Sequence, residues 1–289
     1  MASGVENGGG AYAGRAILLS LAHPDDELGC VSLVSRYVAA GATATLICAT
    51  AGDVGTVDAK YLQGYASIRE LRLAELACAT KAAGMTEVVM FDYRDSGMMG
   101  APDNQNPESL WSALLDNVTA RVADVMRRVR PDVVITFNTY GAYGHPDHIK
   151  INQATVAAFD QLQAEPDHPT KLYYLTLSGR GLRAVLRVLK LFGRDPRRLG
   201  RNSDMDLEAA VAAVTPITTR IRVGARDRAR AREARRCHAS QVTVPPVLDL
   251  LNRVVGPLIF PDVTLSRIIP APRPGAAIER DLFAGLPPR

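Results

Sequence analysis

The stretch AHPDDE at residues 22–27 directly follows the apolar run AILLSL at residues 16–21. A short apolar run of this length is typical of a buried strand, so the polar stretch lies where that strand ends. A second polar stretch, YGHPDH at residues 143–148, follows another strand-like run, VVITF at residues 133–137. Histidines and carboxylates at two strand ends are the donors that a catalytic divalent metal site requires.

Around these runs, segments typical of strands alternate with segments typical of helices. Further strands are expected at residues 42–49, 87–91 and 171–177, and helices at residues 26–40, 67–83, 108–129 and 148–162. Helices between strands at this spacing favour a parallel sheet with right-handed crossovers. We therefore expect an α/β fold: a Rossmann-like, doubly wound, mostly parallel sheet of strand order 3-2-1-4-5, with helices on both faces and a C-terminal elaboration.

This strand order makes a prediction about where the two polar stretches lie. The first and fourth strands are neighbours at the point where the winding reverses, and ligands bind beyond the carboxyl ends of the strands there. The stretches that hold His23 and His145 follow these two strands. We therefore expect them to meet in one crevice, although they are far apart in the sequence.

Three protein ligands and an open position form the usual catalytic zinc site. We assign His23, Asp26 and His148 as the ligands. Asp25, which points in a different direction from its neighbour Asp26, is then free to act as general base. His145 is free to stabilise the oxyanion or to protonate the leaving amine. Two imidazoles and one carboxylate suit Zn²⁺, which we expect, and also Fe²⁺.

Length and composition indicate how the chain is organised. With 289 residues, 47% of them hydrophobic, the chain can bury a sizeable core. We expect a flexible N-terminus (1–14), one catalytic domain (15–245) and a C-terminal extension packed on it (246–289), with residues 270–289 loosely ordered and a strand at 263–269. A basic amphipathic helix is expected within residues 179–202 as an insert whose apolar stripe caps the core. No apolar run is long enough to span a bilayer, and residues 1–14 do not resemble a signal peptide.

Arginine is concentrated in one segment. Residues 180–236 contain fifteen Arg and one Lys against six acids, a local excess of +10 in a chain of net charge +4. This excess fits either a nucleic-acid surface or a solvated, arginine-rich helix. No aromatic residues alternate with the arginines, as they do in single-strand binders, so we expect no nucleic-acid partner.

The four cysteines are widely spaced, and none forms a C-x-x-C motif. Cys30, Cys48 and Cys78 have apolar neighbours in the sequence, as buried thiols do, and the fourth is Cys237. We therefore expect free thiols in a reducing, cytoplasmic setting.

The chain resembles the LmbE-like, or PIG-L, metal-dependent N-deacetylases from its first strand to about residue 241. The matching motifs are AHPDDE (22–27), TAGD (50–53), RLAE (72–75), RDSGM (94–98), YGHPDH (143–148) and HASQ (238–241). The resemblance implies hydrolysis of an acetamide on a small amino sugar, an N-acetylglucosamine conjugate. It also implies the metal ligands, the base and the acid assigned above.

Further roles come from this resemblance alone. Asp147 would orient the imidazole of His145, and Tyr143 matches a tyrosine that contacts the oxyanion. Arg72 matches an arginine that contacts the substrate. Asp95 belongs to a loop similar to the sugar-recognising loop of the mycothiol-pathway deacetylases and amidases. His238 is expected beside the site, where its ring holds a helix end.

Other functions are compatible with parts of this pattern. An amidase that cleaves a larger thiol-sugar conjugate would keep the same metal site. A non-catalytic sugar or nucleotide binding module would use the same crevice without needing Asp25 as a base. A nucleotide-dependent dehydrogenase is disfavoured, because the first strand is not followed by G-x-G-x-x-G. The apolar stripe of the basic helix within residues 179–202 is also compatible with the pairing of subunits in a homo-oligomer.

Overall fold

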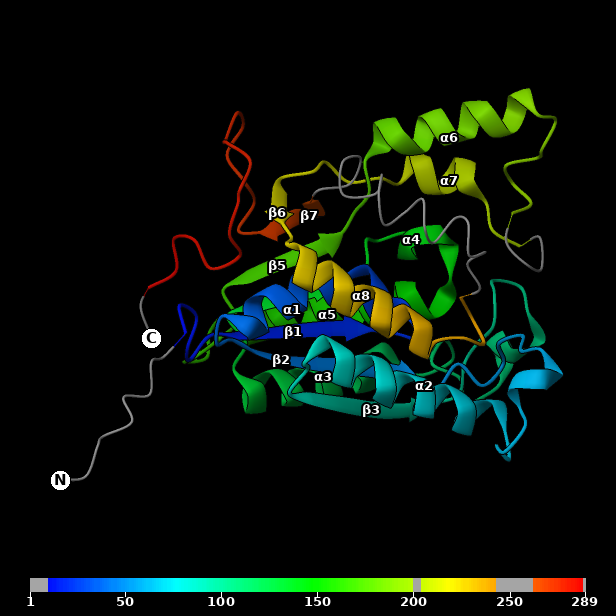
Figure 1. Cartoon of the computed structure of the whole chain (residues 1–289). Helices are drawn as coiled ribbons and strands as arrows, with labels where there is room; N and C mark the ends of the chain where they lie inside the picture. The colour runs from blue at the N-terminus through cyan, green and yellow to red at the C-terminus, as the bar shows by residue number, and fades with distance from the viewer. Residues whose placement is uncertain (1–9, 200–203, 243–261, 288–289) are drawn as a thin grey trace.

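A seven-stranded sheet forms the centre of the molecule, in a computed structural model that describes residues 10–199, 204–242 and 262–287 (Figure 1). Its strand order is β3-β2-β1-β4-β5-β7-β6, so the predicted order 3-2-1-4-5 is confirmed. The parallel strands are β1 (Ala16–Leu21), β2 (Thr43–Thr50), β3 (Glu87–Tyr93), β4 (Val133–Thr136) and β5 (Lys171–Leu175). The antiparallel strands β7 (Asp262–Ile269) and β6 (Thr219–Arg222) extend the sheet beyond β5.

Strand β1 occupies the middle of the parallel part because every one of its side chains is apolar or small. All six residues are buried. Leu19 lies beside Leu46 of β2 on one side and beside Ile135 of β4 on the other. A strand that is covered on both faces reads as a continuous apolar run, which is the pattern of its sequence.

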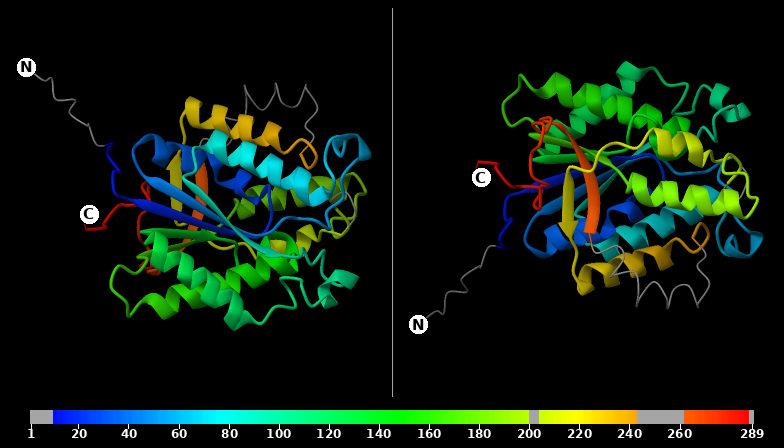
Figure 2. Two further views of the ribbon diagram at one scale, coloured as in Figure 1. Left: turned by 90° about the horizontal axis from the view of Figure 1, so that it is seen from below. Right: turned by 90° about the horizontal axis from the view of Figure 1, so that it is seen from above.

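Helices cover both faces of the sheet (Figure 2). Helices α1 (Val31–Ala39), α2 (Ile68–Ala83) and α8 (Ala225–Cys237) pack together on one face, and α3 (Leu115–Val129) and α5 (Pro146–Leu162) pack together on the other. The remaining helices are α4 (Gly141–Gly144), α6 (Gly179–Leu191), α7 (Leu207–Ala212) and the 3-10 turns η1 (Asp26–Gly29), η2 (Ala59–Tyr61) and η3 (Pro102–Gln105). No helix in the described ranges is long and apolar enough to cross a membrane.

Two helices begin later than the sequence predicted. The segment expected to start a helix at residue 26 forms the turn η1, and α1 begins only at Val31. The helix expected from residue 108 begins at Leu115. The reason is a short bridge with Arg94, which donates its N–H to the Glu108 carbonyl and accepts the N–H of Leu110. Backbone groups that pair with another segment in this way are not available to a helix.

The basic helix expected in the insert is present as α6, but the prediction that it caps the core is wrong. None of its residues is buried. It packs on α7, and its end is open to solvent, with Leu191 and Phe192 exposed to 82% and 76%. Residues 200–202 of the predicted insert lie outside the described residues. The apolar stripe was therefore read correctly as one helix face, but only part of that face is covered.

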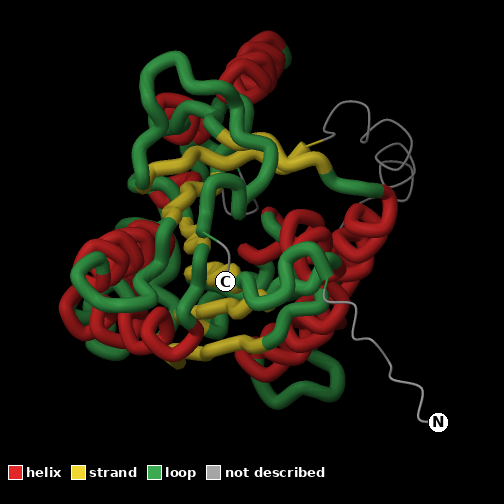
Figure 3. The backbone as a smooth tube through the Cα atoms, turned by 90° about the vertical axis from the view of Figure 1, so that its left-hand side faces the viewer, coloured by secondary structure: helices red, strands yellow, loops and turns green. Residues whose placement is uncertain are grey.

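Residues 279–283, within the segment expected to be loosely ordered, pack on the domain, and Figure 3 views the molecule from the side where they lie. Leu282 and Phe283 join the main core, where the Phe283 ring lies 5.2 Å from that of Tyr37 in α1. The buried ammonium of Lys171 donates to the Glu279 carboxylate at 2.6 Å and to two carbonyls of the same segment. The strand predicted at 263–269 is confirmed as β7. Residues 1–9, 243–261 and 288–289 lie outside the described residues, and the domain boundary at residue 245 stays a prediction.

The cysteines differ in part from the expectation of buried thiols at Cys30, Cys48 and Cys78. Cys78 in α2 is exposed and forms a disulfide with Cys237, at the end of α8. Cys30 and Cys48 are free and buried, as expected. Of its apolar neighbours in the sequence, Leu76 and Ala79 are buried whereas Ala77 and Cys78 are exposed, so the composition around Cys78 misled the prediction. The argument for a reducing setting therefore loses its basis.

Candidate metal centre

The polar stretches after β1 and β4 lie side by side at the carboxyl ends of these two neighbouring strands. His23 Nδ1 is 3.1 Å from His148 Nε2, although 125 positions separate the two residues. The predicted meeting of the two stretches at the reversal of the winding is thus confirmed. The parallel register of β1 with β4 causes it, because it brings both strand ends to the same edge.

The donor atoms of the three residues predicted as ligands lie close together, with each oxygen of Asp26 near a different histidine. Asp26 Oδ1 lies 3.3 Å from His148 Nε2, and Asp26 Oδ2 lies 3.5 Å from His23 Nδ1. Ligands about 2.1 Å from a tetrahedral zinc are about 3.4 Å from one another. The spacing of these donors therefore fits a divalent cation. That these three residues bind it stays a prediction.

Hydrogen bonds on the far side of each ring fix its orientation. His23 Nε2 lies 3.1 Å from Asp147 Oδ2, and His148 Nδ1 lies 3.2 Å from the Gly141 carbonyl. With the ring proton on His23 Nε2 and on His148 Nδ1, the other ring nitrogens, His23 Nδ1 and His148 Nε2, keep their lone pairs for a cation. Metal-binding histidines are commonly held in this manner.

The carboxylate of Asp147 has a different partner from the one that the resemblance implied. It bonds His23 and the loop at Ser96, whereas only the backbone N–H of Asp147 is directed at His145, at 3.2 Å from Nδ1. His145 stands at the start of α5 as its capping residue, so its ring turns back over the first turn of the helix. Asp147 therefore orients a predicted ligand, His23, and not His145.

Charge at this centre favours a cation. Burial lowers the pKa of His23, but the carboxylates of Asp95, Asp147 and Asp26 outweigh it and hold that pKa well above its usual value. Burial raises the pKa of Asp26, but His148 and His23 bring it well below its usual value. Buried carboxylates that outnumber the fixed positive charges around them attract a metal ion.

Other donors near His23 could complete or replace part of the predicted ligand set. His23, His145 and His148 offer nitrogens that all lie within 4.8 Å of one another, and so do one atom each from His23, Asp95, His145 and Asp147. Both groups belong to the part of the chain that the structure describes. Burial, followed by the charges of His23 and His148, lowers the pKa of His145 to about 2.

Asp25 is turned toward Arg72 of α2. Its Oδ2 lies 3.2 Å from the Arg72 guanidinium, which also donates to the carbonyls of Pro24 and Gly52. Burial raises the pKa of Asp25 to about 6, although Arg72 opposes this shift. A Cβ at position 52 would lie 2.0 Å from Arg72 Nη1, so only glycine leaves room for the guanidinium. Arg72, expected to contact the substrate, lines the cavity but is engaged mainly in holding the turn around Asp25.

Tyr143 lies on a loop of unusual backbone geometry. Gly141 and Ala142 both have positive φ, at 67° and 63°. A Cβ on Gly141 would lie 2.8 Å from that of His148, so glycine is required where the loop passes over this histidine. The Tyr143 ring meets that of His148 edge-on, with centroids 5.1 Å apart, and burial raises the pKa of its hydroxyl. The loop thereby places the tyrosine at the wall of the cavity.

Asp95 is buried beside the centre, with Oδ1 3.7 Å from His23 Nε2 and 2.8 Å from the Gly97 N–H that it accepts. The neighbouring Ser96 was not predicted. Its N–H donates to Asp147 Oδ2 at 3.0 Å, and its hydroxyl donates to Oδ1 of the same carboxylate. Its position in the RDSGM motif was the available signal. Ser96 thus holds the carboxylate that orients His23.

A cavity of about 450 Å³ lies beside this centre. It is lined by His23, Asp25, Arg72, Asp95, Tyr143 and His145 of the predicted residues. Asp204, Met205, Ser240 and Gln241 line it from the C-terminal half; of these, the sequence singled out only Ser240 and Gln241, as part of the HASQ motif. His238 does not line the cavity; it is fully buried behind it, against Glu27.

Comparison with known proteins gives this arrangement a context. Residues 18–159 match the model of a family described as GlcNAc-PI de-N-acetylase, PIG-L. The 1D-myo-inositol 2-acetamido-2-deoxy-alpha-D-glucopyranoside deacetylase of Acidothermus cellulolyticus is 36% identical over 94% of this chain and 95% of its own length. The protein of the same name from Thermobifida fusca is 35% identical over 93% of this chain and 99% of its own length.

Solved structures share the fold. The conserved protein TT1542 of Thermus thermophilus superposes with a TM-score of 0.55 at 20% identity, over 90% of this chain and 98% of that one. The N,N'-diacetylchitobiose deacetylase of Pyrococcus horikoshii superposes with a TM-score of 0.51 at 16% identity, over 88% of this chain and 84% of that one. With relatives above 30% identity along nearly their whole length, the chain belongs to the PIG-L family of GlcNAc-PI de-N-acetylases.

Proposed function

We propose that this chain is a metal-dependent N-deacetylase that removes the acetyl group from an N-acetylglucosamine joined to inositol. The observation that carries the proposal is the close approach of His23, Asp26 and His148 at the carboxyl ends of β1 and β4, next to Asp25. The relatives that match over more than 90% of this chain are named as deacetylases of 1D-myo-inositol 2-acetamido-2-deoxy-alpha-D-glucopyranoside, which supports that substrate. The amidase of larger conjugates and the non-catalytic binding module are not favoured by these names.

His23, Asp26 and His148 would hold the cation, which we infer to be Zn²⁺, with Fe²⁺ as the other metal that such donors suit. When bound, the ion would acidify a water and polarise the acetamide carbonyl. Asp147 and the Gly141 carbonyl keep the two imidazoles in the orientation that this requires. We infer a small amino-sugar substrate, which the names of the relatives support, and no nucleic-acid partner.

The reaction replaces a C–N bond by a C–O bond, and Asp25 moves the proton that this demands. Its carboxylate lies at the cavity wall, so it can accept a proton from the attacking water. The same proton can pass to the nitrogen of the sugar as the C–N bond breaks, which releases acetate and a free amine. Arg72 holds the carboxylate at 3.2 Å and limits the directions in which it can point.

Negative charge develops on the former carbonyl oxygen during attack. Tyr143 and His145 line the cavity on the side of the β4 loop and are placed to donate hydrogen bonds to this oxygen or to the leaving nitrogen. Donors of this kind typically contribute roughly 10²–10³-fold in kcat. Asp95, at the neighbouring wall, is placed to bind a sugar hydroxyl.

Acetate release from a panel of N-acetylated amino sugars tests the proposal, with the inositol conjugate, free N-acetylglucosamine and chitobiose as substrates. We expect turnover of the inositol conjugate by the Zn²⁺-loaded protein and none after treatment with a chelator. Asp25→Asn should keep the metal and lose at least about 10²-fold in kcat, because the proton acceptor is removed. Absence of acetate from every substrate with either Zn²⁺ or Fe²⁺ would refute the deacetylase proposal. Near-normal kcat in Asp25→Asn would remove Asp25 as the base.

A further inference from the structure

The backbone at Asp25 adopts a conformation that residues other than glycine rarely take. Its φ and ψ are 102° and −21°. A residue in such a region costs about 1–3 kcal/mol and persists only when its surroundings hold it. The Asp25 N–H donates to Glu27 Oε2 at 2.9 Å, and the Asp25 carbonyl accepts the N–H of Leu28 at 3.0 Å. The carboxylate of Glu27 is thus the partner of the Asp25 N–H that holds this turn.

Glu27 is itself held from one side. It is fully buried, and its second oxygen, Oε1, lies 2.6 Å from Nε2 of His238, which is also fully buried. A carboxylate without partners in the interior is expensive, so this contact decides how the Glu27 side chain is placed. Thus Glu27 Oε1 contacts the His238 ring, and Glu27 Oε2 accepts the backbone N–H of Asp25.

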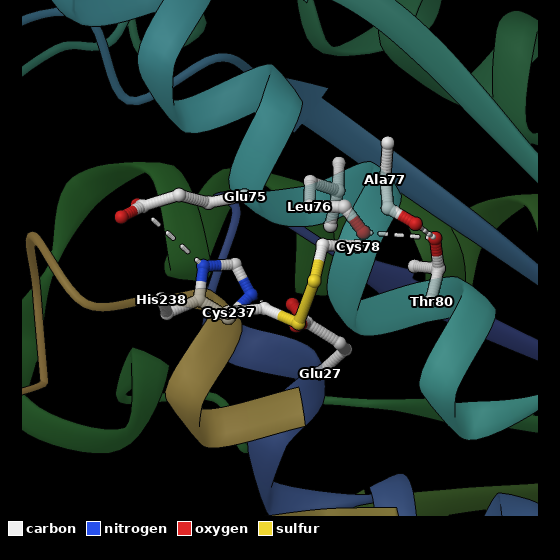
Figure 4. The surroundings of a disulfide bond; sticks show 8 residues. All are labelled: Glu27, Glu75, Leu76, Ala77, Cys78, Thr80, Cys237 and His238. Atoms are coloured by element: carbon white, nitrogen blue, oxygen red, sulfur yellow. Dashed lines mark hydrogen bonds and ion pairs between the residues drawn. A yellow bond between two sulfur atoms is a disulfide. The ribbon is translucent and has the colours of Figure 1, made fainter. Parts of the chain in front are cut away.

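The His238 ring lies beside α2 (Figure 4). Cys237, the residue before it, is joined to Cys78 of α2. On the other side of the ring, Nδ1 lies 3.9 Å from Oε2 of Glu75, whose carboxylate also accepts the N–H and the hydroxyl of Ser240 at 2.8 Å each. The ring therefore stands between two buried carboxylates, one from η1 and one from α2.

We propose that His238 is a positioning residue for the reaction, which acts through Glu27 on the backbone of Asp25. It fixes the turn, and with it the direction in which the Asp25 carboxylate enters the cavity. The inference rests on the proposed function, because it assumes that Asp25 moves the proton. Asp26 is anchored separately, by the His23 N–H at 2.6 Å. Loss of His238 should therefore affect turnover far more than metal binding.

Two variants of His238 separate positioning from simple packing. His238→Leu removes the donor to Glu27, whereas His238→Gln keeps an N–H at a similar distance along the side chain. With the Zn²⁺-loaded protein and the inositol conjugate, we expect His238→Leu to lose about 10–100-fold in kcat with KM within about twofold and one metal per chain. His238→Gln should recover most of this loss. Ser35→Ala is the matched control, because it removes an equally buried bond, from Ser35 to the Ala83 carbonyl in the same helix layer, outside this chain of contacts.

Hydrogen exchange of the Asp25 backbone amide gives a readout that needs no activity. We expect this amide to be protected in the parent chain, in His238→Gln and in Ser35→Ala, and to exchange faster in His238→Leu. Unchanged protection or unchanged kcat in His238→Leu would overturn the inference, as would a loss of metal that matches the loss of kcat. Faster exchange in a protein whose parent chain deacetylates no sugar would refute the proposed function while supporting the contact chain from His238 to Asp25.

Discussion

Reduction of the Cys78–Cys237 disulfide should lower the stability of the whole molecule. The bond joins α2 to α8 across a sequence separation of 159 residues. In the chain-entropy account, a cross-link over this length lowers the entropy of the unfolded chain and so raises its free energy by about 5 kcal/mol at 25 °C. Measured effects are commonly smaller, so we expect a loss of about 2–5 kcal/mol. This is a large part of the roughly 5–15 kcal/mol that usually stabilises a domain.

Urea unfolding in a chelator measures this loss without a contribution from metal. The single Trp, Trp111, and far-ultraviolet circular dichroism provide two independent signals. The parent chain with a reductant and the double variant Cys78→Ser/Cys237→Ser should unfold at the same, lower urea concentration. The reductant should have no effect on the double variant, which is the control.

A count of thiols decides whether the bond is present at all. In denaturant without reductant, two thiols should react with Ellman's reagent, and four should react after reduction. Four reactive thiols before reduction would refute the pairing. A reductant that shifts the parent chain and the double variant equally would refute the stability argument.

Three other predictions concern the centre, the end of the chain and the buried thiols. His148→Ala should lower the bound metal well below one per chain by elemental analysis, because it removes one of three proposed donors; unchanged stoichiometry would exclude His148 as a ligand. Phe283→Ala should lower the free energy of unfolding by about 3–5 kcal/mol in urea, because its ring packs in the main core; a loss under about 1 kcal/mol would show that the C-terminal segment is not packed there. Burial raises the pKa of Cys30 to about 12 and that of Cys48 well above its usual value, so iodoacetamide at pH 8 should modify neither in the native protein and both in urea. Mass spectrometry would detect a modified native thiol, which would contradict their burial.

The parallel half of the fold could be predicted because its signals are local. Runs such as residues 16–21 and 133–137 are apolar throughout, which only strands covered on both faces tolerate. Once five strands alternate with helices, the right-handed crossover rule leaves few strand orders. The meeting of His23 with His148 followed from that order, without any information on side chains.

The antiparallel half carried weaker signals. Strand β6 has only four residues and alternates Thr, Arg, Ile and Arg within the arginine-rich segment, so composition hid it. The packing of Phe283 against Tyr37 joins positions far apart in the chain, and nothing in the local sequence marks such a contact. The exposure of α6 was not predicted for a related reason: an apolar stripe shows which helix face can be covered, but not whether another element covers it.

At the centre, residue types were predictable and connections were not. The sequence placed His, Asp and Tyr at the right strand ends, because their chemistry needs them there. It could not indicate that Asp147 turns to His23 and Ser96 instead of His145, because this depends on how the first turn of α5 is capped. The contact between Glu27 and His238 likewise joins two motifs whose relation appears only when α8 is placed against η1.

Because Leu282 and Phe283 fill a space next to the first helix, the order of synthesis matters for this protein. A ribosome makes α1 early, but the ring that covers Tyr37 is translated only after every strand of the sheet. Until then the Tyr37 ring has Tyr12 as an aromatic neighbour but lacks its contact with Phe283. Fusion partners and affinity tags are therefore better attached ahead of residue 10 than behind residue 287.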